Sequence, residues 1–255
     1  MRITATTSSD GVFERDFTLG DITGVLWSPA SGPPGAPLVL MGHGGGLHKK
    51  APGLLRRARY YAATCGYTVA AIDAPGHGAR RRTAEDEHAR AALRRAREDG
   101  EPLGPIIAAY NTALAERAVP EWRATLDALQ AETGAGTPVG YTGMTLATAI
   151  GLALAAADPR INAAVIGGAL AYDALTAAAR RVTIPVRYLL PWDDAELDRA
   201  SGIALFDALS SPDKTLHTTP GGHHQVPWYE TEESARFFQR HLDQPTTPRE
   251  RQSAT

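Results

Sequence analysis

Hydrophobic and polar positions follow two different patterns along the chain. Near the N-terminus, two short β-like runs at 13–19 and 22–27 flank Gly20 and Asp21, which predicts an antiparallel hairpin at a sheet edge. After a turn rich in Gly and Pro over 29–37, short continuous apolar runs alternate with helix-length amphipathic segments. Buried parallel strands joined by crossover helices have this pattern, so we expect an α/β fold.

The individual elements are predicted from the same periodicity. After the hairpin, strands are expected at 38–41, 68–72, 138–141, 163–166, 186–190 and 215–217. Helices are expected at 54–65, 122–132, 146–156, 203–209 and 232–241. We therefore expect a single domain over 1–242, followed by a polar, disordered tail over 243–255.

One insertion, over about 80–118, interrupts the alternation of strands and helices. It is polar, rich in arginine and helical, and the breaker at 100–105 divides it into two helices. A solvated helical pair on the surface is one interpretation. The other is a cap over the site, because the insertion follows a strand whose C-terminal end faces the crevice where open α/β sheets bind ligands.

Composition narrows the class of protein without indicating a macromolecular partner. Hydrophobic residues make up 43% and charged residues 21% of the 255 residues, as in globular proteins with a packed core. The formal net charge of −2 gives no general attraction to nucleic acid or anionic lipid, and the one cysteine, Cys65, cannot form an internal disulfide. The sequence has no signal-peptide pattern and no apolar run of about 18 residues. We therefore expect a soluble cytoplasmic protein.

Residues 138–148 have the pattern of a nucleophile elbow, the tight turn between a strand and a helix that holds a catalytic side chain above the sheet edge. In the usual motif, GxSxG, the central serine is the nucleophile. Here residues 143–147 read GMTLA, so Thr145 supplies the hydroxyl. An ordinary strand-to-helix turn is the alternative when this segment is considered alone.

A glycine-rich run follows the strand expected at 38–41. It reads GHGGG over 42–46, and such a loop can direct backbone N–H groups at the negative charge that develops on a carbonyl oxygen. We expect an oxyanion hole formed by Gly44 and Gly45, with the N–H of Leu146 as a further donor. A flexible loop is the alternative interpretation.

Candidates for an acid and a base follow the last two expected strands. Asp194 is the expected acid that orients a histidine, and the neighbouring Asp193 is its alternative. His223 is the expected base because it directly follows a pair of glycines, whereas His224 is interpreted as a neighbouring loop residue. The resulting order along the chain is nucleophile, acid, base, with Thr145 first.

Two residues beside these groups are candidate substrate contacts. Met144 precedes the nucleophile candidate, and Trp192 precedes the two aspartates. Packing is the alternative role for Trp192.

These motifs, in this order, resemble the α/β-hydrolase superfamily, and most closely its dienelactone-hydrolase-like esterase branch, over about residues 20–242. The run DAPGHG over 73–78 also looks like the D-x-PGHG turn of that superfamily, which makes His77 a structural or rim residue rather than the base. The resemblance implies an α/β-hydrolase fold, with a mostly parallel central sheet flanked by helices and a small helical cap. It implies no metal and no organic cofactor.

The resemblance also implies an acyl-enzyme reaction. His223 removes the hydroxyl proton of Thr145, the oxygen attacks an ester or related carbonyl, and water then releases the acyl group. Threonine departs from the serine of the family, because a β-branched side chain is stiff about χ1 and costs about 1–3 kcal/mol to hold at a strained backbone. Slow or specialised hydrolysis and lost hydrolysis are both compatible with this departure.

Three hypotheses follow from the sequence. The first is hydrolysis of an ester, thioester or lactone of a small to medium organic molecule by Thr145, His223 and Asp194. The second keeps the pocket and the oxyanion hole for elimination, cyclisation or acyl transfer, with His223 as acid and base. The third is a catalytically inactive binding protein. The sequence identifies neither the substrate nor the oligomeric state.

Overall fold

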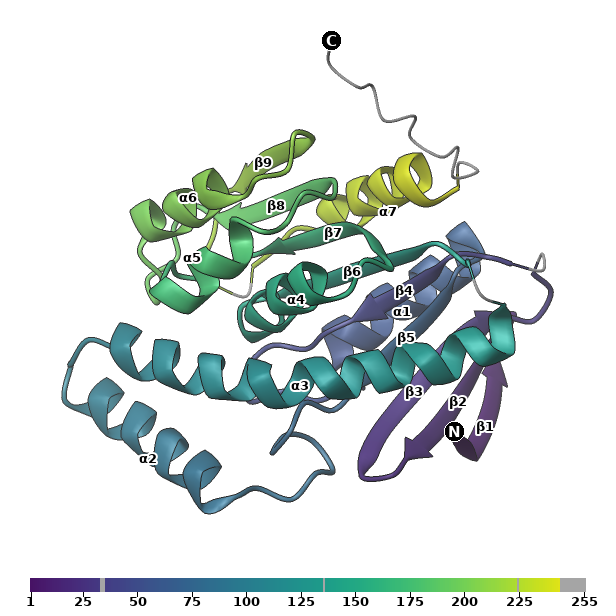
Figure 1. The fold of residues 1–255 in the computed structure, drawn as a ribbon, viewed down its shortest axis with the longest axis horizontal. Helices are drawn as coiled ribbons and strands as arrows, with labels where there is room; N and C mark the ends of the chain where they lie inside the picture. Colours follow the sequence, from purple (N-terminus) through teal and green to yellow (C-terminus); the bar gives the residue numbers. More distant parts are fainter. Residues whose placement is uncertain (33–34, 135, 224, 244–255) are drawn as a thin grey trace, which may run out of the picture.

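A nine-stranded sheet forms the centre of the computed structural model, which describes residues 1–32, 35–134, 136–223 and 225–243. The strand order across the sheet is β1-β2-β3-β5-β4-β6-β7-β8-β9 (Figure 1). The strands are β1 (Arg2–Ser9), β2 (Val12–Leu19), β3 (Ile22–Pro29), β4 (Leu38–Met41), β5 (Thr68–Ile72), β6 (Val139–Met144), β7 (Ile161–Gly167), β8 (Val186–Pro191) and β9 (Lys214–Thr219). The helices are α1 (Pro52–Cys65), α2 (Ala84–Glu98), α3 (Gly104–Thr133), α4 (Leu146–Ala157), α5 (Asp173–Ala179), α6 (Arg199–Ala208) and α7 (Trp228–Leu242).

The direction of the strands agrees with the predicted α/β architecture. β1, β2, β3 and β5 pair antiparallel, whereas β5, β4, β6, β7, β8 and β9 pair parallel. The chain reverses its direction of travel across the sheet at β4, because β5 lies on one side of β4 and β6 on the other. Ligands bind at such a switch point, beyond the carboxyl ends of the strands.

Helices cover both faces of the sheet and create two hydrophobic cores. Figure 1 shows α3, α4, α5 and α6 on one face and α1 and α7 on the other. The first core joins α3–α6 to the sheet, and the second joins α1 and α7 to it. All four residues of β4 and all six of β8 are buried, as expected for strands covered on both sides.

Two elements were not predicted from the sequence. Every residue of β1 is exposed, so this edge strand has no alternation of buried and exposed positions and is held by its pairing with β2. α5 has only seven residues, too few for a helical period to stand out in an alanine-rich stretch.

The insertion consists of α2 and the first half of α3, which lie side by side away from the sheet (Figure 1). Residues 122–132 are helical as predicted, but they belong to the longer α3, which continues through Pro120 as one 30-residue helix. An interior proline costs a helix about 3 kcal/mol. The helix stays continuous because it buries one apolar face along its length, at Leu114, Ala118, Trp122, Leu126 and Leu129.

The end of α7 defines the last described residue. Asp243 caps this helix and its carboxylate accepts a hydrogen bond of 3.0 Å from the Tyr67 hydroxyl. Asp243, the first residue of the predicted tail, is therefore ordered against α7 and Tyr67, and residues 244–255 lie outside the described residues.

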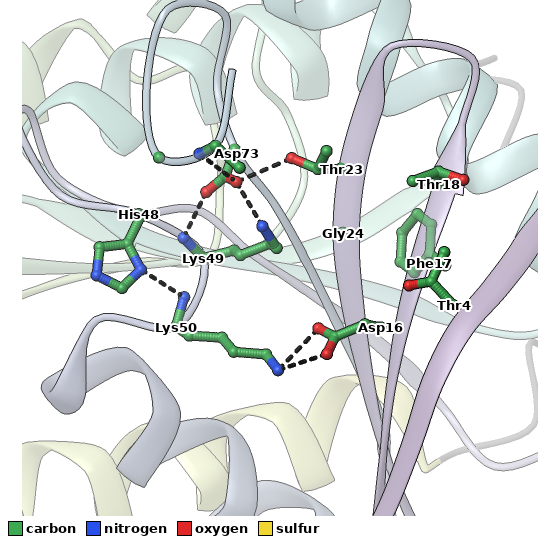
Figure 2. Close-up of a pocket in the computed structure, with 12 residues that line it drawn as sticks. Thr4, Asp16, Phe17, Thr18, Thr23, Gly24, His48, Lys49, Lys50 and Asp73 are labelled. Atoms are coloured by element: carbon green, nitrogen blue, oxygen red, sulfur yellow. Dashed lines mark hydrogen bonds and ion pairs between the residues drawn. The ribbon is translucent and has the colours of Figure 1, made fainter. Parts of the chain in front are cut away.

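A buried carboxylate in the turn after β5 connects this turn to β3 and to the segment that follows the glycine-rich loop. Asp73 is fully buried and accepts hydrogen bonds from the backbone N–H of Lys49 at 2.9 Å, from its Nζ at 2.5 Å and from the Thr23 hydroxyl at 2.9 Å (Figure 2). The N–H of Ala79 adds a fourth at 3.2 Å. Gly78, with φ 56°, must be glycine because a Cβ there would lie 2.2 Å from the Asp73 carboxylate.

The hollow next to Asp73, of about 540 Å³, is bordered by two lysines that are already paired. Lys49 is paired with Asp73, and Lys50 contacts Glu14 at 2.8 Å and Asp16 at 2.7 Å. Figure 2 shows Lys49 directed at Asp73 and Lys50 directed at Asp16. We therefore interpret these contacts as structural ones that hold β3, the segment after the glycine-rich loop and the turn after β5 together.

The Asp73 contacts predict a large loss of stability on substitution. Burial alone would raise the pKa of the Asp73 carboxyl, but the donors from Lys49, Thr23 and Ala79 outweigh it and hold this pKa below its ordinary value. Asp73→Ala leaves the charge of Lys49, whose side chain is 14% exposed, without its partner and should lower the free energy of unfolding by about 3 kcal/mol, measured by urea denaturation at pH 7.

The exposed Asp207 of α6 provides the matched control, since Asp207→Ala should change the free energy of unfolding by less than about 0.5 kcal/mol. The contribution of Asp73 to the free energy of unfolding is complete above the ordinary aspartate pKa of about 3.9. It is lost as the pH falls through the lowered pKa of Asp73 in the folded protein. Equal stability of Asp73→Ala and the parent protein would contradict this structural role of Asp73.

Candidate active site

Thr145 lies at the sharp turn between β6 and α4. Its backbone has φ 60° and ψ −115°, and among the described residues Asp10 is the other non-glycine residue with positive φ. A β-branched residue in this region of φ and ψ stores about 1–3 kcal/mol of strain. This is the backbone form of a nucleophile elbow, which lifts the central side chain above the carboxyl edge of the sheet.

The small residues of the elbow are required by close packing. A Cβ on Gly143 would lie 2.3 Å from the Cβ of Ala147, and one on Gly42 would lie 2.4 Å from the Tyr141 hydroxyl. That hydroxyl donates to the carbonyl of Ala147 at 2.7 Å. The ends of β4 and β6 and the start of α4 therefore approach one another only because these positions carry no larger side chain.

Thr148 fixes the elbow to the neighbouring strand and was not singled out by sequence analysis. Its buried hydroxyl donates to the carbonyl of Gly167 at 2.6 Å and accepts from the N–H of the same residue at 2.9 Å. The N–H of Thr145 also donates to the carbonyl of Gly167, at 3.0 Å. The sequence signal that could have identified Thr148 is a hydroxyl residue within an otherwise apolar helix.

The two branches of the Thr145 side chain face different loops. A Cβ on Gly44 would lie 3.1 Å from Thr145 Oγ1, so the hydroxyl faces the glycine-rich loop. A Cβ on Gly168 would lie 3.7 Å from Thr145 Cγ2, so the methyl group faces the loop after β7. The side chain is thus oriented with its oxygen toward the predicted oxyanion hole.

His43 holds the glycine-rich loop through its backbone. The N–H of Ala74 donates to His43 Nε2 at 3.0 Å, so the ring proton resides on Nδ1, which donates to the carbonyl of Gly44 at 2.9 Å. Burial lowers the pKa of His43 to about 4, and the ring is neutral at pH 7. Because C=O and N–H point in opposite directions across a trans peptide, the N–H of Gly45 is directed away from the imidazole.

The other predicted donor belongs to α4. Leu146 is the first residue of this helix and is buried. The N–H groups of the first helical turn have no acceptor within the helix and carry a partial positive charge. Of the three predicted donors, Gly44 is the one whose position faces the Thr145 hydroxyl, and Leu146 follows Thr145 at the N-terminus of α4.

His77, from the turn after β5, is buried behind this loop. Its Nδ1 donates to the carbonyl of Pro75 at 3.0 Å, and its ring centroid lies 5.3 Å from that of His43. Burial lowers the pKa of His77 as well.

His223 and Asp194 form a hydrogen-bonded pair. The distance from His223 Nδ1 to Asp194 Oδ2 is 2.7 Å, and the side chains are 15% and 3% exposed. The second oxygen, Asp194 Oδ1, accepts from the N–H groups of Glu196 at 2.9 Å and Leu197 at 3.1 Å. Because the carboxylate accepts at Nδ1, the basic lone pair of the imidazole lies on Nε2.

Asp193 has a different partner from Asp194. Its carboxylate accepts from the N–H of Gly221 at 3.1 Å, and its own N–H donates to the carbonyl of Gly221 at 3.1 Å. Asp193 therefore holds the backbone of the loop that carries His223, whereas Asp194 contacts the imidazole itself. His224 lies outside the described residues.

The two predicted substrate contacts lie in different surroundings. Trp192 is 40% exposed, and the guanidinium of Arg199 lies 4.0 Å above its ring. Met144 is partly buried, and its Cε would lie 3.0 Å from a Cβ on Gly168. Met144 is therefore close to the Thr145 methyl group, and Trp192 lies at the surface under Arg199.

The topology brings the candidate residues to one edge of the sheet. Thr145 follows β6, Asp194 follows β8 and His223 follows β9, all at the carboxyl ends of parallel strands. Within the described ranges, no group of three or more His, Cys, Asp or Glu side chains is arranged to hold a metal ion. None of the helices in this part of the chain is both long and apolar enough to cross a membrane.

The chain is similar to solved esterase structures. A PEG-bound cold-adapted esterase from an Arctic intertidal metagenomic library is 33% identical, with a TM-score of 0.77, over 95% of this chain and 100% of that one. An acetyl xylan esterase from Paenibacillus sp. R4 is 15% identical, with a TM-score of 0.68, over 94% and 88% of the two chains. A predicted CIB-like hydrolase from Thermoplasma acidophilum is 12% identical, with a TM-score of 0.65, over 92% and 100%.

The more distant of these similarities show the fold, and the first also shows the family. No protein-family model matches the sequence, and no curated protein matches it either. The dienelactone-hydrolase-like branch therefore stays a prediction, whereas the predicted α/β-hydrolase fold is confirmed by the mostly parallel sheet and by the esterase neighbours. The chain belongs to the α/β-hydrolase esterase family that includes the Arctic enzyme.

Proposed function

We propose that the protein hydrolyses a carboxylic ester, thioester or lactone of a small to medium organic molecule, with Thr145, His223 and Asp194 as the catalytic residues. The observation that carries this proposal is the position of Thr145, on a strained elbow with Oγ1 facing the glycine-rich loop. The His223 to Asp194 hydrogen bond and the membership of an esterase family support it. The esterase relatives favour neither the non-hydrolytic nor the binding hypothesis.

In the first half of the reaction, Thr145 is acylated. His223 Nε2 accepts the proton of Thr145 Oγ1 as the oxygen forms a bond to the carbonyl carbon. The tetrahedral intermediate collapses when the bond to the alcohol oxygen breaks, and the imidazolium of His223 returns the proton to that oxygen. Asp194 stabilises the imidazolium and keeps the ring in the required tautomer.

In the second half, water replaces the alcohol. His223 removes a proton from water, the hydroxide adds to the acyl carbon, and the bond to Thr145 Oγ1 breaks as that oxygen regains the proton. In both halves the N–H groups of Gly45 and Leu146, with Gly44 alongside, would stabilise the negative oxygen. The loss of one such donor typically slows catalysis about 100- to 1000-fold.

The threonine methyl group has a definite place in this scheme. Since Cγ2 faces Gly168, rotation about χ1 would move the oxygen away from the glycine-rich loop and put the methyl group against Gly44. A β-branched side chain resists this rotation. The methyl group therefore fixes the hydroxyl in the position where it can attack, which is the reason we assign Thr145 as a competent nucleophile.

Substitution of Thr145 tests the nucleophile. Thr145→Ala removes the attacking oxygen and should lower kcat for p-nitrophenyl butyrate by at least about 1000-fold, whereas Thr145→Ser keeps the hydroxyl and should stay within about tenfold of the parent. A fluorophosphonate should add covalently to the parent and to Thr145→Ser, detected by intact mass. Full activity of Thr145→Ala would exclude this mechanism.

The two aspartates give a matched pair for testing the acid. Asp194→Asn removes the charge that holds the tautomer of His223 and should lower kcat about 1000- to 10,000-fold. Asp193→Asn keeps an oxygen that can accept the N–H of Gly221, so its kcat should stay within about tenfold of the parent. The opposite ranking of these two variants would assign the acid to Asp193.

The buried His43 predicts a dependence of stability on pH. Burial lowers its pKa from an ordinary 6.5 to about 4, so between these values the unfolded chain binds the proton more readily than the folded chain. The contribution of neutral His43 to the free energy of unfolding is complete above pH 6.5. It is lost as the pH falls toward 4, by up to about 1.4 kcal/mol per pH unit.

His43→Gln cannot bind this proton and is the comparison for the pH measurement. Urea denaturation of both proteins at pH 7, 5.5 and 4.5 should show a steeper loss of unfolding free energy in the parent. Parallel pH profiles for the two proteins would show that His43 is not held as a neutral ring.

A further inference from the structure

We propose that the apolar groove between α3, α4 and α5 binds the acyl chain of the substrate, so that the preferred substrates are esters of straight-chain carboxylic acids of medium length. This inference rests on the proposed ester hydrolysis at Thr145.

The groove has a volume of about 380 Å³ and a mostly apolar lining. Protein interiors are close-packed and rarely leave such a space between helices, and ligand pockets begin at about 300 Å³. The volume therefore suits a flexible chain better than a large ring system. The lining residues used below are Ala149 and Ala153 of α4, Val119 of α3, Ala178 of α5, and Thr112 and Tyr172 at its rim.

Two residues of the groove follow Thr145 along α4. Positions four residues apart follow one face of an α-helix, so Ala149 and Ala153 continue from Thr145 at about 6 Å and 12 Å along α4. The N–H of Ala149 donates to the carbonyl of Thr145 at 3.4 Å as a backbone bond of the first helical turn, so the helical register includes Thr145. An acyl group attached to Thr145 can therefore run along this face.

One wall of the groove is continuous with the loop that contacts Thr145. The methyl group of Thr145 faces Gly168, and four residues later the same loop reaches Tyr172, just before α5. Oγ1 faces the glycine-rich loop on the other side. The apolar branch of the nucleophile is thus directed at the loop that leads into the groove.

The chemistry of the reaction assigns the groove to the acyl part of the ester. The leaving oxygen must face His223, which returns a proton to it, and the carbonyl oxygen must face the glycine-rich loop and the N-terminus of α4. The acyl substituent is the remaining group on the carbonyl carbon. It is therefore the part that can extend between α3 and α5.

The polar groups at the groove have other partners or face water. Burial raises the pKa of Tyr172 to about 12, and its phenol hydrogen-bonds the Thr112 side chain across the rim. The Thr112 hydroxyl itself donates to the carbonyl of Ala108 at 2.8 Å. Glu116 is exposed at the outer side. The interior of the groove is left apolar, which favours hydrocarbon.

The test compares p-nitrophenyl esters from acetate to dodecanoate. In the parent protein, kcat/KM should rise about fourfold for each methylene that enters the groove, reach a maximum at medium length and then fall. Ala178→Leu and Ala153→Leu fill the groove and should lower the octanoate-to-butyrate ratio of kcat/KM about tenfold or more. Val119→Ala enlarges it and should move the maximum to longer chains.

Ala177→Leu is the matched control, because Ala177 is the exposed neighbour of Ala178 on α5 and does not line the groove. Its octanoate-to-butyrate ratio should equal that of the parent. A second series, of acetate esters with alcohols of increasing length, should respond equally in Ala178→Leu and in the parent. An effect of Ala178→Leu on the alcohol series alone would overturn the assignment to the acyl chain.

The outcomes separate this inference from the proposed function. If Ala178→Leu and Ala153→Leu hydrolysed all the esters with the same dependence on acyl length as the parent, the assignment of the groove to the acyl chain would be refuted and the esterase function would stand. If no ester were hydrolysed, the proposed function would fail, and calorimetry with sodium octanoate would still test the groove. Octanoate should bind the parent and Ala177→Leu at least tenfold more tightly than Ala178→Leu, and equal binding would refute the inference.

Discussion

A β-branched residue at φ 60° must be forced into that conformation by its neighbours, and most features of this site follow from how the chain does so. The strands β4 and β6 end close together because Gly42, Gly143 and Ala147 carry little or no side chain. The end of β7 then holds the turn through Thr148 and the backbone of Gly167. The strain at Thr145 persists because several short contacts determine the turn at once.

The loops around this turn are each attached to a neighbouring loop by a polar group. His43 connects the glycine-rich loop to the turn after β5, and Lys49 connects the segment that follows to Asp73. Asp193 connects the loop after β8 to the one after β9. Loops normally have few contacts and move, so these attachments place the reacting groups on a rigid edge.

Sequence patterns predicted the parts of the site that depend on local backbone. The elbow and the glycine-rich loop were recognisable because a tight turn and a close backbone approach demand glycine or alanine at fixed positions. The sequence could not separate Asp193 from Asp194, because adjacent residues in a loop differ only in the direction of their side chains. Gly168 was missed for a similar reason, since its importance depends on a contact with a residue 23 positions earlier.

The continuity of α3 also determines how the insertion can move. A 30-residue helix is about 45 Å long, and its second half is packed against the sheet through Trp122 and Leu126. Its first half is packed as well, through Leu114 and Ala118 against the same core, so the helix is held on both sides of Pro120. A bend at Pro120, where a backbone hydrogen bond is missing, would shift Leu114 and Ala118 within the core that they share with α4, so a movement of the insertion is coupled to the helix that follows Thr145.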